Sequence, residues 1–320
     1  MYEAAMRRAL HLAASVRAST SPNPWVGAVV EPGGFEGSTR PPGGAHAEVV
    51  ALDAAGDRAR GATLVVTLEP CAHSARTPPC VDAIVAAGVA RVVIGVEDPD
   101  PRVRGRGIAA LRDAGIEVEV GVCAEEVRAQ LAPYFKHRTT GRPWVVLKLA
   151  ASADGRTAAP DGSSRWITGA EARADAHRLR SESDAVIVGA GTVRADDPAL
   201  TVRDVEGRDP LRVVLGRAPE GAKVHPALEL EGDLGQVLDE LGRRGVVQAM
   251  VEGGPTVAGE FHRAGLVDRY VLYVAPVLLG GDDGRPVFAG PGAQRIEDVW
   301  RGRIESVEQL GDDLRVELTA

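Results

Sequence analysis

Short apolar runs alternate with amphipathic segments along the whole chain, and this alternation constrains the fold more than any other feature. Residues 62–70 (ATLVVTLEP) and 91–97 (RVVIGVE) have the valine-rich composition of buried strands, and helical patterns follow them at 80–88 and 107–115. Strands separated by helices of about ten residues pack as βαβ units, in which helices cover a largely parallel sheet. The sequence therefore predicts a layered α/β fold.

A domain boundary is expected at residues 137–143 (HRTTGRP), because a second buried strand begins directly after them at 144–152 (WVVLKLAAS). We predict domains at 1–140 and 141–320, the second with a mixed sheet. In the first we expect helices near 2–18, 46–56, 80–88 and 107–115, strands near 25–30, 62–70, 91–97 and 116–122, and a glycine- and proline-rich loop at 31–45. In the second we expect helices near 171–183, 234–245 and 256–265, strands near 144–152, 185–191, 210–216, 247–254 and 269–279, and a final strand pair.

Composition excludes several classes of protein. The chain has 44% hydrophobic residues and no apolar run of the length that a membrane helix needs, so we expect a soluble cytoplasmic protein with no membrane partner. Three cysteines in 320 residues favour thiolate chemistry over a disulfide framework. The formal net charge of −8 argues against a protein that binds nucleic acid.

The residues with the strongest chemical signal lie between positions 46 and 80. His46 and Glu48 begin a predicted helix, Cys71 ends a strand-to-loop turn in LEPC, and Cys80 follows Pro78-Pro79 at another helix start. One histidine and two cysteines make three zinc ligands, which leaves the fourth position of the metal for water. Zinc would lower the pKa of that water, and Glu48 would move its proton, as in the zinc deaminases.

Two alternatives stand beside this interpretation. His73 could be a fourth ligand, which would make the zinc site closed and structural, or both cysteines could simply fill the core. The spacing also departs from the general deaminase motif, because eight residues separate Cys71 from Cys80 where that motif has two.

The second half has two glycine turns after predicted strands, in VIVGAGTVRADDP and MVEGGPTVAGEF. Neither is a full dinucleotide-binding fingerprint, but Gly253 and Gly254 precede a helix, whose free N–H groups would hold a diphosphate. Phosphorylated ligands are also favoured by four arginines in the turns, namely Arg165, Arg180, Arg194 and Arg203.

Over nearly its whole length the chain resembles the bifunctional deaminase/reductase family of riboflavin biosynthesis. The first half carries the resemblance in TSPNPWVGAVV, HAEVVAL, TLEPCAHSARTPPC and DPDPRVRGRG, and the second in WVVLKLAASADGRTA, GSSRWITG, GTVRADDPALTVR and MVEGGPTVAGEF. The eight-residue gap between the cysteines is usual in this family. The resemblance implies a cytidine-deaminase-like three-layer α/β/α domain with one zinc ion, followed by a dihydrofolate-reductase-like α/β domain that uses NADPH. It also implies a homo-oligomer assembled through the reductase domain.

The implied activities are hydrolytic deamination of a phosphoribosylamino-substituted diaminopyrimidinone and then reduction of its ribosyl group to ribityl. For the first, the resemblance implies His46, Cys71 and Cys80 as zinc ligands and Glu48 as the proton shuttle. NADPH would contact Ala150, Trp166, Thr192, Asp196, Gly254, Pro255 and Thr256. The substrates would contact Asn23 and His73 in the first domain, and Lys148, Ser164, Arg180, Leu200, Arg203 and Glu252 in the second.

The sequence departs from the family pattern at a few positions. Ala75 replaces a usual glycine, Asp100 replaces asparagine and Ala153 replaces leucine, and residues 217–236 are shorter than in most relatives. If the trimming removed a sheet edge, the adenine side of the NADPH site would be affected. The alternative is therefore a monofunctional deaminase whose second domain binds ligand without turnover.

Overall fold

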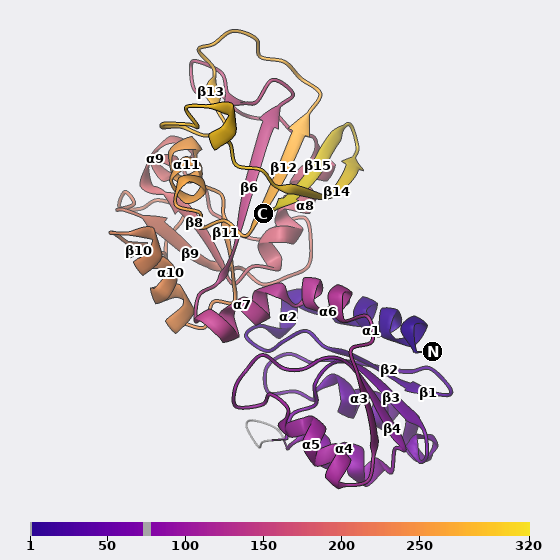
Figure 1. Ribbon diagram of the computed structural model, residues 1–320. Helices are drawn as coiled ribbons and strands as arrows, with labels where there is room; N and C mark the ends of the chain where they lie inside the picture. The colour runs from indigo at the N-terminus through magenta and orange to yellow at the C-terminus, as the bar shows by residue number, and fades with distance from the viewer. Residues whose placement is uncertain (1, 73–77) are drawn as a thin grey trace. The chain divides into compact units, whose positions relative to one another are not determined.

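The computed structural model describes residues 2–72 and 78–320, so His73 and Ala75 lie outside the described residues. The chain divides into two compact units, Met1–Gly141 and Arg142–Ala320 (Figure 1). Each unit has hydrophobic clusters of its own. No helix in the described part of the chain is long and apolar enough to cross a membrane.

The first unit is built on a five-stranded sheet in the order β2-β1-β3-β4-β5. Strand β1 pairs antiparallel with β2 and β3, whereas β3, β4 and β5 are parallel. The valine-rich β3 and β4 are buried on both faces, as expected for central parallel strands. The strands are β1 (Gly27–Glu31), β2 (Phe35–Ser38), β3 (Thr63–Leu68), β4 (Arg91–Val96) and β5 (Glu117–Val120).

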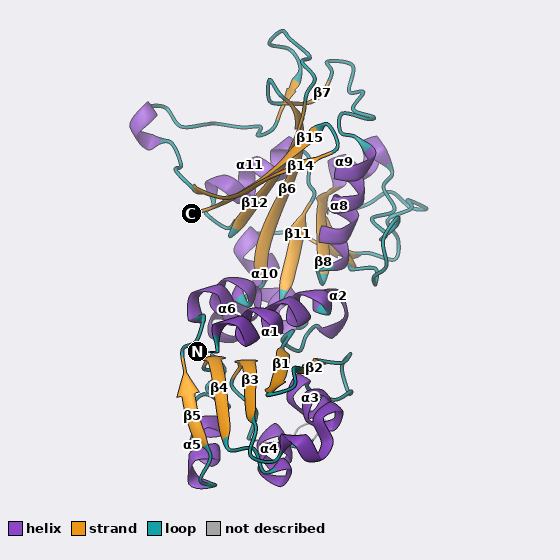
Figure 2. Ribbon diagram, turned by 90° about the vertical axis from the view of Figure 1, so that its right-hand side faces the viewer, coloured by secondary structure: helices purple, strands orange, loops and turns teal. Residues whose placement is uncertain are grey.

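Helices cover both faces of this sheet, which gives the three layers. Helix α1 packs on β1 and β3 and contacts α6, while α3 packs on β1 and β2 and contacts α4 (Figure 2). Two glycines allow this close approach, because a Cβ at Gly27 would lie 1.9 Å from the carbonyl oxygen of Ala9, and one at Gly37 2.1 Å from that of Ala47. The helices are α1 (Glu3–Ser15), α2 (Arg17–Thr20), α3 (Ala47–Ala55), η1 (Gly56–Ala59), α4 (Cys80–Ala87), α5 (Arg106–Asp113), α6 (Ala124–Gln130) and α7 (Ala132–Thr140).

The second unit has an eight-stranded mixed sheet in the order β10-β9-β8-β11-β6-β12-β15-β14. Strands from β10 to β12 are parallel, and β15 and β14 add an antiparallel edge. A short ribbon pairs β7 with β13. The strands are β6 (Trp144–Ser152), β7 (Arg156–Ala158), β8 (Ala185–Gly189), β9 (Leu211–Leu215), β10 (Leu228–Leu230), β11 (Gln248–Val251), β12 (Arg269–Ala275), β13 (Arg285–Pro286), β14 (Arg303–Leu310) and β15 (Asp313–Thr319).

Helices lie on both sides of this sheet as well (Figure 2). Ala172 and Leu179 of α8 pack with Met250 and Tyr273 in one cluster, and Leu238 and Phe261 of α10 and α11 belong to the cluster on the other face. The helices are α8 (Ala170–Ser181), α9 (Ala190–Asp196), α10 (Leu234–Arg243), α11 (Pro255–Arg263) and η2 (Ile296–Asp298).

The predicted α/β class and the mixed sheet are confirmed. Several segments differ from expectation, among them helices α6 and α7 and strands β7 and β13, which were not expected. The loop expected at 31–45 contains β2, an edge strand with little apolar pattern that pairs with β1. The glycine turn at 190–196 is a short helix, α9. The trimmed segment keeps a strand, because β10 pairs in parallel with β9, so the edge of the sheet is present.

Candidate functional site

His46, Cys71 and Cys80 meet in the first unit, as the sequence predicts. The Nδ1 atom of His46 lies 3.1 Å from the Sγ atom of Cys80 and 3.7 Å from that of Cys71, and the two sulfurs are 3.5 Å apart. With zinc bonds of roughly 2.0 to 2.3 Å, neighbouring corners of a tetrahedron are about 3.5 Å apart. The three donor atoms therefore have the spacing and the chemistry of a zinc site.

Local structure explains why these three side chains converge. His46 is the residue before α3, Cys80 is the first residue of α4, and Cys71 follows the carboxyl end of β3. The two cysteine segments are joined by backbone as well, since the N–H of Val81 donates to the carbonyl of Cys71 at 3.2 Å. A hydrogen bond with Cys80 lowers the pKa of the Cys71 thiol to about 4, which favours the thiolate form that binds metals.

Glu48 lies in the first turn of α3, beside this group, and is only 4% exposed. Burial raises the pKa of its carboxyl above the ordinary value, and the nearby His46 acts in the opposite direction. A buried carboxyl with a raised pKa suits a group that both accepts and returns a proton.

Glu69 is a further buried residue of this region that sequence reasoning missed. Its carboxylate accepts hydrogen bonds from the backbone N–H groups of Asp98, Gly105, Gly107 and Ile108, at 2.9 to 3.3 Å. It thereby attaches the loop before α5, and the start of α5, to the turn that bears Cys71. The signal was the acid in LEPC, which stands at the end of an otherwise apolar strand.

The same loop contains two aspartates with opposite environments. Burial raises the pKa of Asp98 to about 6, and its carboxylate accepts a hydrogen bond from the hydroxyl of Tyr134 at 3.2 Å. Asp100, the departure from the family pattern, is paired with Arg102 at 2.6 Å, which lowers its pKa to about 2. The negative charge of its carboxylate is therefore balanced by Arg102 within the loop. Asn23 is half-buried in the turn between α2 and β1, and no contact between it and the metal group is defined.

The second unit has two adjoining cavities, of about 480 and 880 Å³, and every residue predicted for its sites lines at least one of them. Six of the predicted residues line both, namely Lys148, Ala150, Ser164, Thr192, Asp196 and Glu252. The smaller cavity adds Trp166, Arg180, Leu200 and Arg203, and the larger adds Gly254, Pro255 and Thr256. The predicted cofactor and substrate residues thus occupy one continuous region at the carboxyl ends of β6, β8 and β11.

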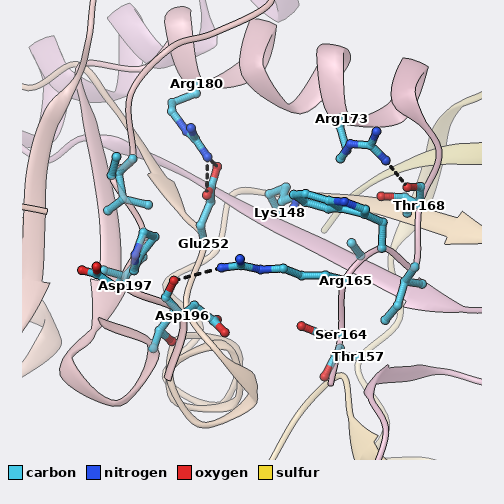
Figure 3. A pocket seen from close by; sticks show the side chains of 18 of the residues that line it. Lys148, Thr157, Ser164, Arg165, Thr168, Arg173, Arg180, Asp196, Asp197 and Glu252 are labelled. Carbon is cyan, nitrogen blue, oxygen red and sulfur yellow. Dashed lines mark hydrogen bonds and ion pairs between the residues drawn. The ribbon is translucent and has the colours of Figure 1, made fainter. Parts of the chain in front are cut away.

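A buried charge cluster lies where the cavities join (Figure 3). Arg180 of α8 and Glu252 point toward each other, with a shortest N–O distance of 2.8 Å. Burial raises the pKa of Glu252, but Arg180 and Lys148 outweigh it, and the net shift is downward. Burial lowers the pKa of Lys148, and Glu252 partly opposes that shift.

The glycine turns line the larger cavity, with one difference from expectation. The N–H of Gly254 donates to the hydroxyl of Thr192 at 3.1 Å, so it is already engaged and is not free for a diphosphate. Helix α11 begins directly after it without a side-chain cap. Its first N–H groups remain the ones available to an anion.

Other residues also line the smaller cavity, including Arg165, one of the four arginines that the sequence marks as favouring a phosphorylated ligand. Arg165 reaches the carbonyl of Asp196 at 2.9 Å, and Arg173 lies over the ring of Trp166 at 4.6 Å and donates to the carbonyl of Thr168 (Figure 3). Lys223, from the trimmed segment, pairs with Asp197 at 3.1 Å. No local sequence pattern identifies Arg173 or Lys223 as a cavity residue. Only the folding of the chain brings them there.

Comparison with known proteins identifies a family for each half of the chain. Residues 1–96 match the cytidine and deoxycytidylate deaminase zinc-binding region, and residues 143–316 match the RibD C-terminal domain. The riboflavin biosynthesis protein RibD of Mycobacterium tuberculosis is 45% identical over 99% of this chain and 96% of its own. Two solved structures also cover 99% of this chain and 98% of theirs. Acinetobacter baumannii RibD has a TM-score of 0.92 at 39% identity. The diaminohydroxyphosphoribosylaminopyrimidine deaminase/5-amino-6-(5-phosphoribosylamino)uracil reductase of Thermotoga maritima has 0.89 at 36% identity.

The first unit has a zinc-compatible His/Cys/Cys group, and the second has two cavities large enough for ligands. The relatives share both units across nearly their full length. The chain belongs to the RibD family, the bifunctional deaminase/reductase enzymes of riboflavin biosynthesis.

Proposed function

We propose that the first unit deaminates a phosphoribosylamino-substituted diaminopyrimidinone and that the second reduces the ribosyl group of the product with NADPH. The observation that supports this proposal is that each unit brings the residues of one candidate site together. The metal group of the first has Glu48 beside it, and the two cavities of the second meet at Lys148 and Glu252.

In the first unit, His46, Cys71 and Cys80 would hold the zinc, and the fit rests on their donor atoms lying within 4.8 Å of one another. When bound, zinc supplies Lewis-acid chemistry that activates water for attack on the amino-bearing ring carbon. Glu48 takes the proton of that water on its carboxylate and returns a proton to the departing amine, so that ammonia leaves. Burial keeps bulk water away from this carboxyl.

In the second unit, the larger cavity suits the dinucleotide. Gly191 has open space where a side chain would stand, and the uncapped start of α11 offers N–H groups and a positive dipole end to the diphosphate. When bound, NADPH supplies the hydride that reduces the ribosyl carbon. We assign Ala150, Thr192, Asp196 and Gly254 to Thr256 to its binding, together with Trp166, which reaches it from the adjoining smaller cavity.

The smaller cavity suits the phosphorylated product of deamination. Arg203 lines this cavity and has one side-chain hydrogen bond in the described structure, to the hydroxyl of Thr201 at 3.4 Å, which leaves most of its donors for a phosphate. Ser164, Leu200 and the Arg180–Glu252 pair would hold the rest of the molecule. Lys148, at the junction with the larger cavity, would donate hydrogen bonds to the ribosyl oxygens as an ammonium group. Asn23 and His73 remain our candidates for substrate contacts in the first unit.

The experiment that tests this proposal supplies the purified protein with the diaminopyrimidinone substrate, with and without NADPH. We expect the ring absorbance to change in both reactions and NADPH to be oxidised only after deamination. Deamination without any NADPH oxidation would contradict the second half of the proposal and leave a monofunctional deaminase.

We further propose a homo-oligomer through the second unit, in the cytoplasm. The edge strand β14 supports this assembly, because it is exposed over most of its length and carries Ile304 and Val307 at 61% and 58% exposure. An exposed apolar edge strand is a surface on which another strand can pair. Sedimentation of the intact protein tests the assembly.

The cytoplasmic location is supported by the cysteines, because the three free thiols suit a reducing compartment.

A further inference from the structure

Tyr273 lies behind the reduction site and is only 1% exposed. Lys148 of β6 is in register with Val271 of β12, and Ala150 with Tyr273, so Lys148 and Tyr273 are diagonal neighbours on one face of the sheet. The Nζ atom of Lys148 lies 5.8 Å from the centre of the Tyr273 ring. This distance is within the range of cation–π attraction.

The tyrosine ring is itself held from behind. Its hydroxyl donates a hydrogen bond to the Oδ2 atom of Asp175 on α8 at 2.6 Å. Asp175 is fixed in turn by Arg178 at 2.6 Å and by Arg315 of β15 at 3.2 Å. The ring therefore has a defined place between the charge network on its far side and Lys148 on its near side.

The ammonium group of Lys148 has no hydrogen bond or ion pair within the described residues. The charged groups that act on it are Glu252, which favours its charged form, and Arg180, which disfavours it. His177, on α8 like Arg180, is also close to this network through Arg180 at 3.4 Å. Desolvation works against the ammonium, and an aromatic face counters desolvation without adding a second negative charge.

We propose that Tyr273 is a positioning residue of the reduction site: its ring holds the Lys148 ammonium at the junction of the two cavities and favours the charged form. The inference rests on the proposed function of Lys148 as a donor to the ribosyl group. Packing in the hydrophobic cluster beneath α8 keeps the ring in place, and Tyr273 acts on the substrate only through Lys148.

The test compares Tyr273→Leu with Tyr273→Phe in the full-length protein. Phenylalanine keeps the aromatic face, and Asp175 keeps both of its arginine partners. Reduction of the deaminated substrate is followed from pH 6 to 10, together with NADPH affinity by fluorescence titration and deamination as an internal check of folding. Tyr270→Leu is the matched control, because Tyr270 is a buried tyrosine of the same strand whose hydroxyl pairs with His262 instead.

For Tyr273→Leu we expect kcat for reduction to fall and its high-pH limb to move to lower pH by ~0.5 unit or more, with NADPH affinity unchanged. Tyr273→Phe should restore the wild-type profile, and Tyr270→Leu should leave it unmoved. The inference would be overturned if the pH profile of reduction did not shift in Tyr273→Leu. It would also be overturned if kcat for reduction fell as far in Tyr273→Phe as in Tyr273→Leu. Lys148→Met distinguishes failure of this inference from failure of the proposed function. Wild-type reduction by that variant would refute the role of Lys148 itself.

Discussion

At the scale of single residues, the two acids of the first unit that differ most from ordinary surface carboxylates are Glu48 and Asp98. Both are buried, and burial is the largest cause of the raised pKa of each. Their surroundings separate their roles. Glu48 stands beside the zinc-compatible His/Cys/Cys group, whereas Asp98 accepts hydrogen bonds from Tyr134 and from the backbone of Asp100 within a loop.

Glu48→Gln removes the proton acceptor and keeps the size of the side chain. We expect deamination to slow by about 100-fold or more, the usual range for loss of a general base. Ammonia release measures that step, and metal analysis should show wild-type zinc content. Reduction of the already deaminated substrate should continue at its normal rate. Loss of both activities with zinc and fold intact would show that the two sites are not independent.

Asp98→Asn should change how stability depends on pH. The folded-state pKa of Asp98 is raised to about 6, above the unfolded value, so ionisation of this group destabilises the folded protein. That penalty is absent below about pH 4, grows as pH rises to about 6 and is then constant at about 3 kcal/mol. Asparagine carries no such penalty. We therefore expect the variant to gain stability relative to wild type between pH 4 and 6, by about 3 kcal/mol at most.

Urea unfolding of the first unit across this pH range measures the difference in free energy. Asp53→Asn, at an exposed position of α3, is the matched control and should show no comparable rise. The expectation would be wrong if the difference in unfolding free energy between Asp98→Asn and wild type stayed constant from pH 4 to 7. Asp98 would then be ionised over this whole range.

At the scale of elements, the start of α5 depends on a residue far away in sequence. Its N-cap, Gly105, has a left-handed conformation and no side chain to cap the helix. Glu69, at the end of β3, accepts the N–H groups of Gly107 and Ile108 instead. Gly107 is required for this approach, because a Cβ there would lie 1.9 Å from the carbonyl oxygen of Pro70.

Glu69→Gln should weaken this junction, since an amide NH₂ would face N–H donors that now meet a carboxylate oxygen. We expect a loss of about 1 to 3 kcal/mol of stability in the first unit, the cost of leaving a buried donor unsatisfied. Deamination should fall with it, and reduction should not. Chemical denaturation and the two activity assays measure these effects. Asp233→Ala, which removes the side-chain cap of α10, is a control for helix capping in the other unit.

If Glu69→Gln left both stability and deamination at wild-type values, the carboxylate would not be holding the loop to the Cys71 turn.

The sequence predicted most of these elements because their patterns are local. Buried strands such as β3 and β6 and amphipathic helices such as α10 have periodicity that a single segment displays. Strands β2 and β10 were missed because each depends on pairing with a neighbouring strand. The convergence of His46, Cys71 and Cys80 in a zinc-compatible group was predictable from residue type and spacing. The roles of Glu69, Arg173 and Tyr273 could not be predicted, because their contacts form only when segments far apart in the sequence come together.

At the scale of the whole molecule, the two units have separate cores and separate sites. Among residues 2–72 and 78–320, one hydrophobic cluster lies within the first unit and three lie within the second. The metal group belongs to the first unit alone, and both cavities belong to the second alone. A ligand that binds one folded unit should therefore stabilise that unit in particular, because binding energy adds to the stability of the structure that forms the site.

Calorimetry can test this independence by removing zinc and adding NADPH in separate experiments. Chelation should lower the melting temperature of one transition, that of the first unit, because its three ligands lose the ion that holds them together. NADPH at about 100 times its Kd should add about 2.7 kcal/mol to the other unit, which raises its melting temperature by ~5 °C or more. Deamination should disappear with zinc, while reduction of the deaminated substrate continues. A single transition that moves as a whole with either treatment would show instead that the two units unfold as one, and that the division into separate cores does not extend to their stability.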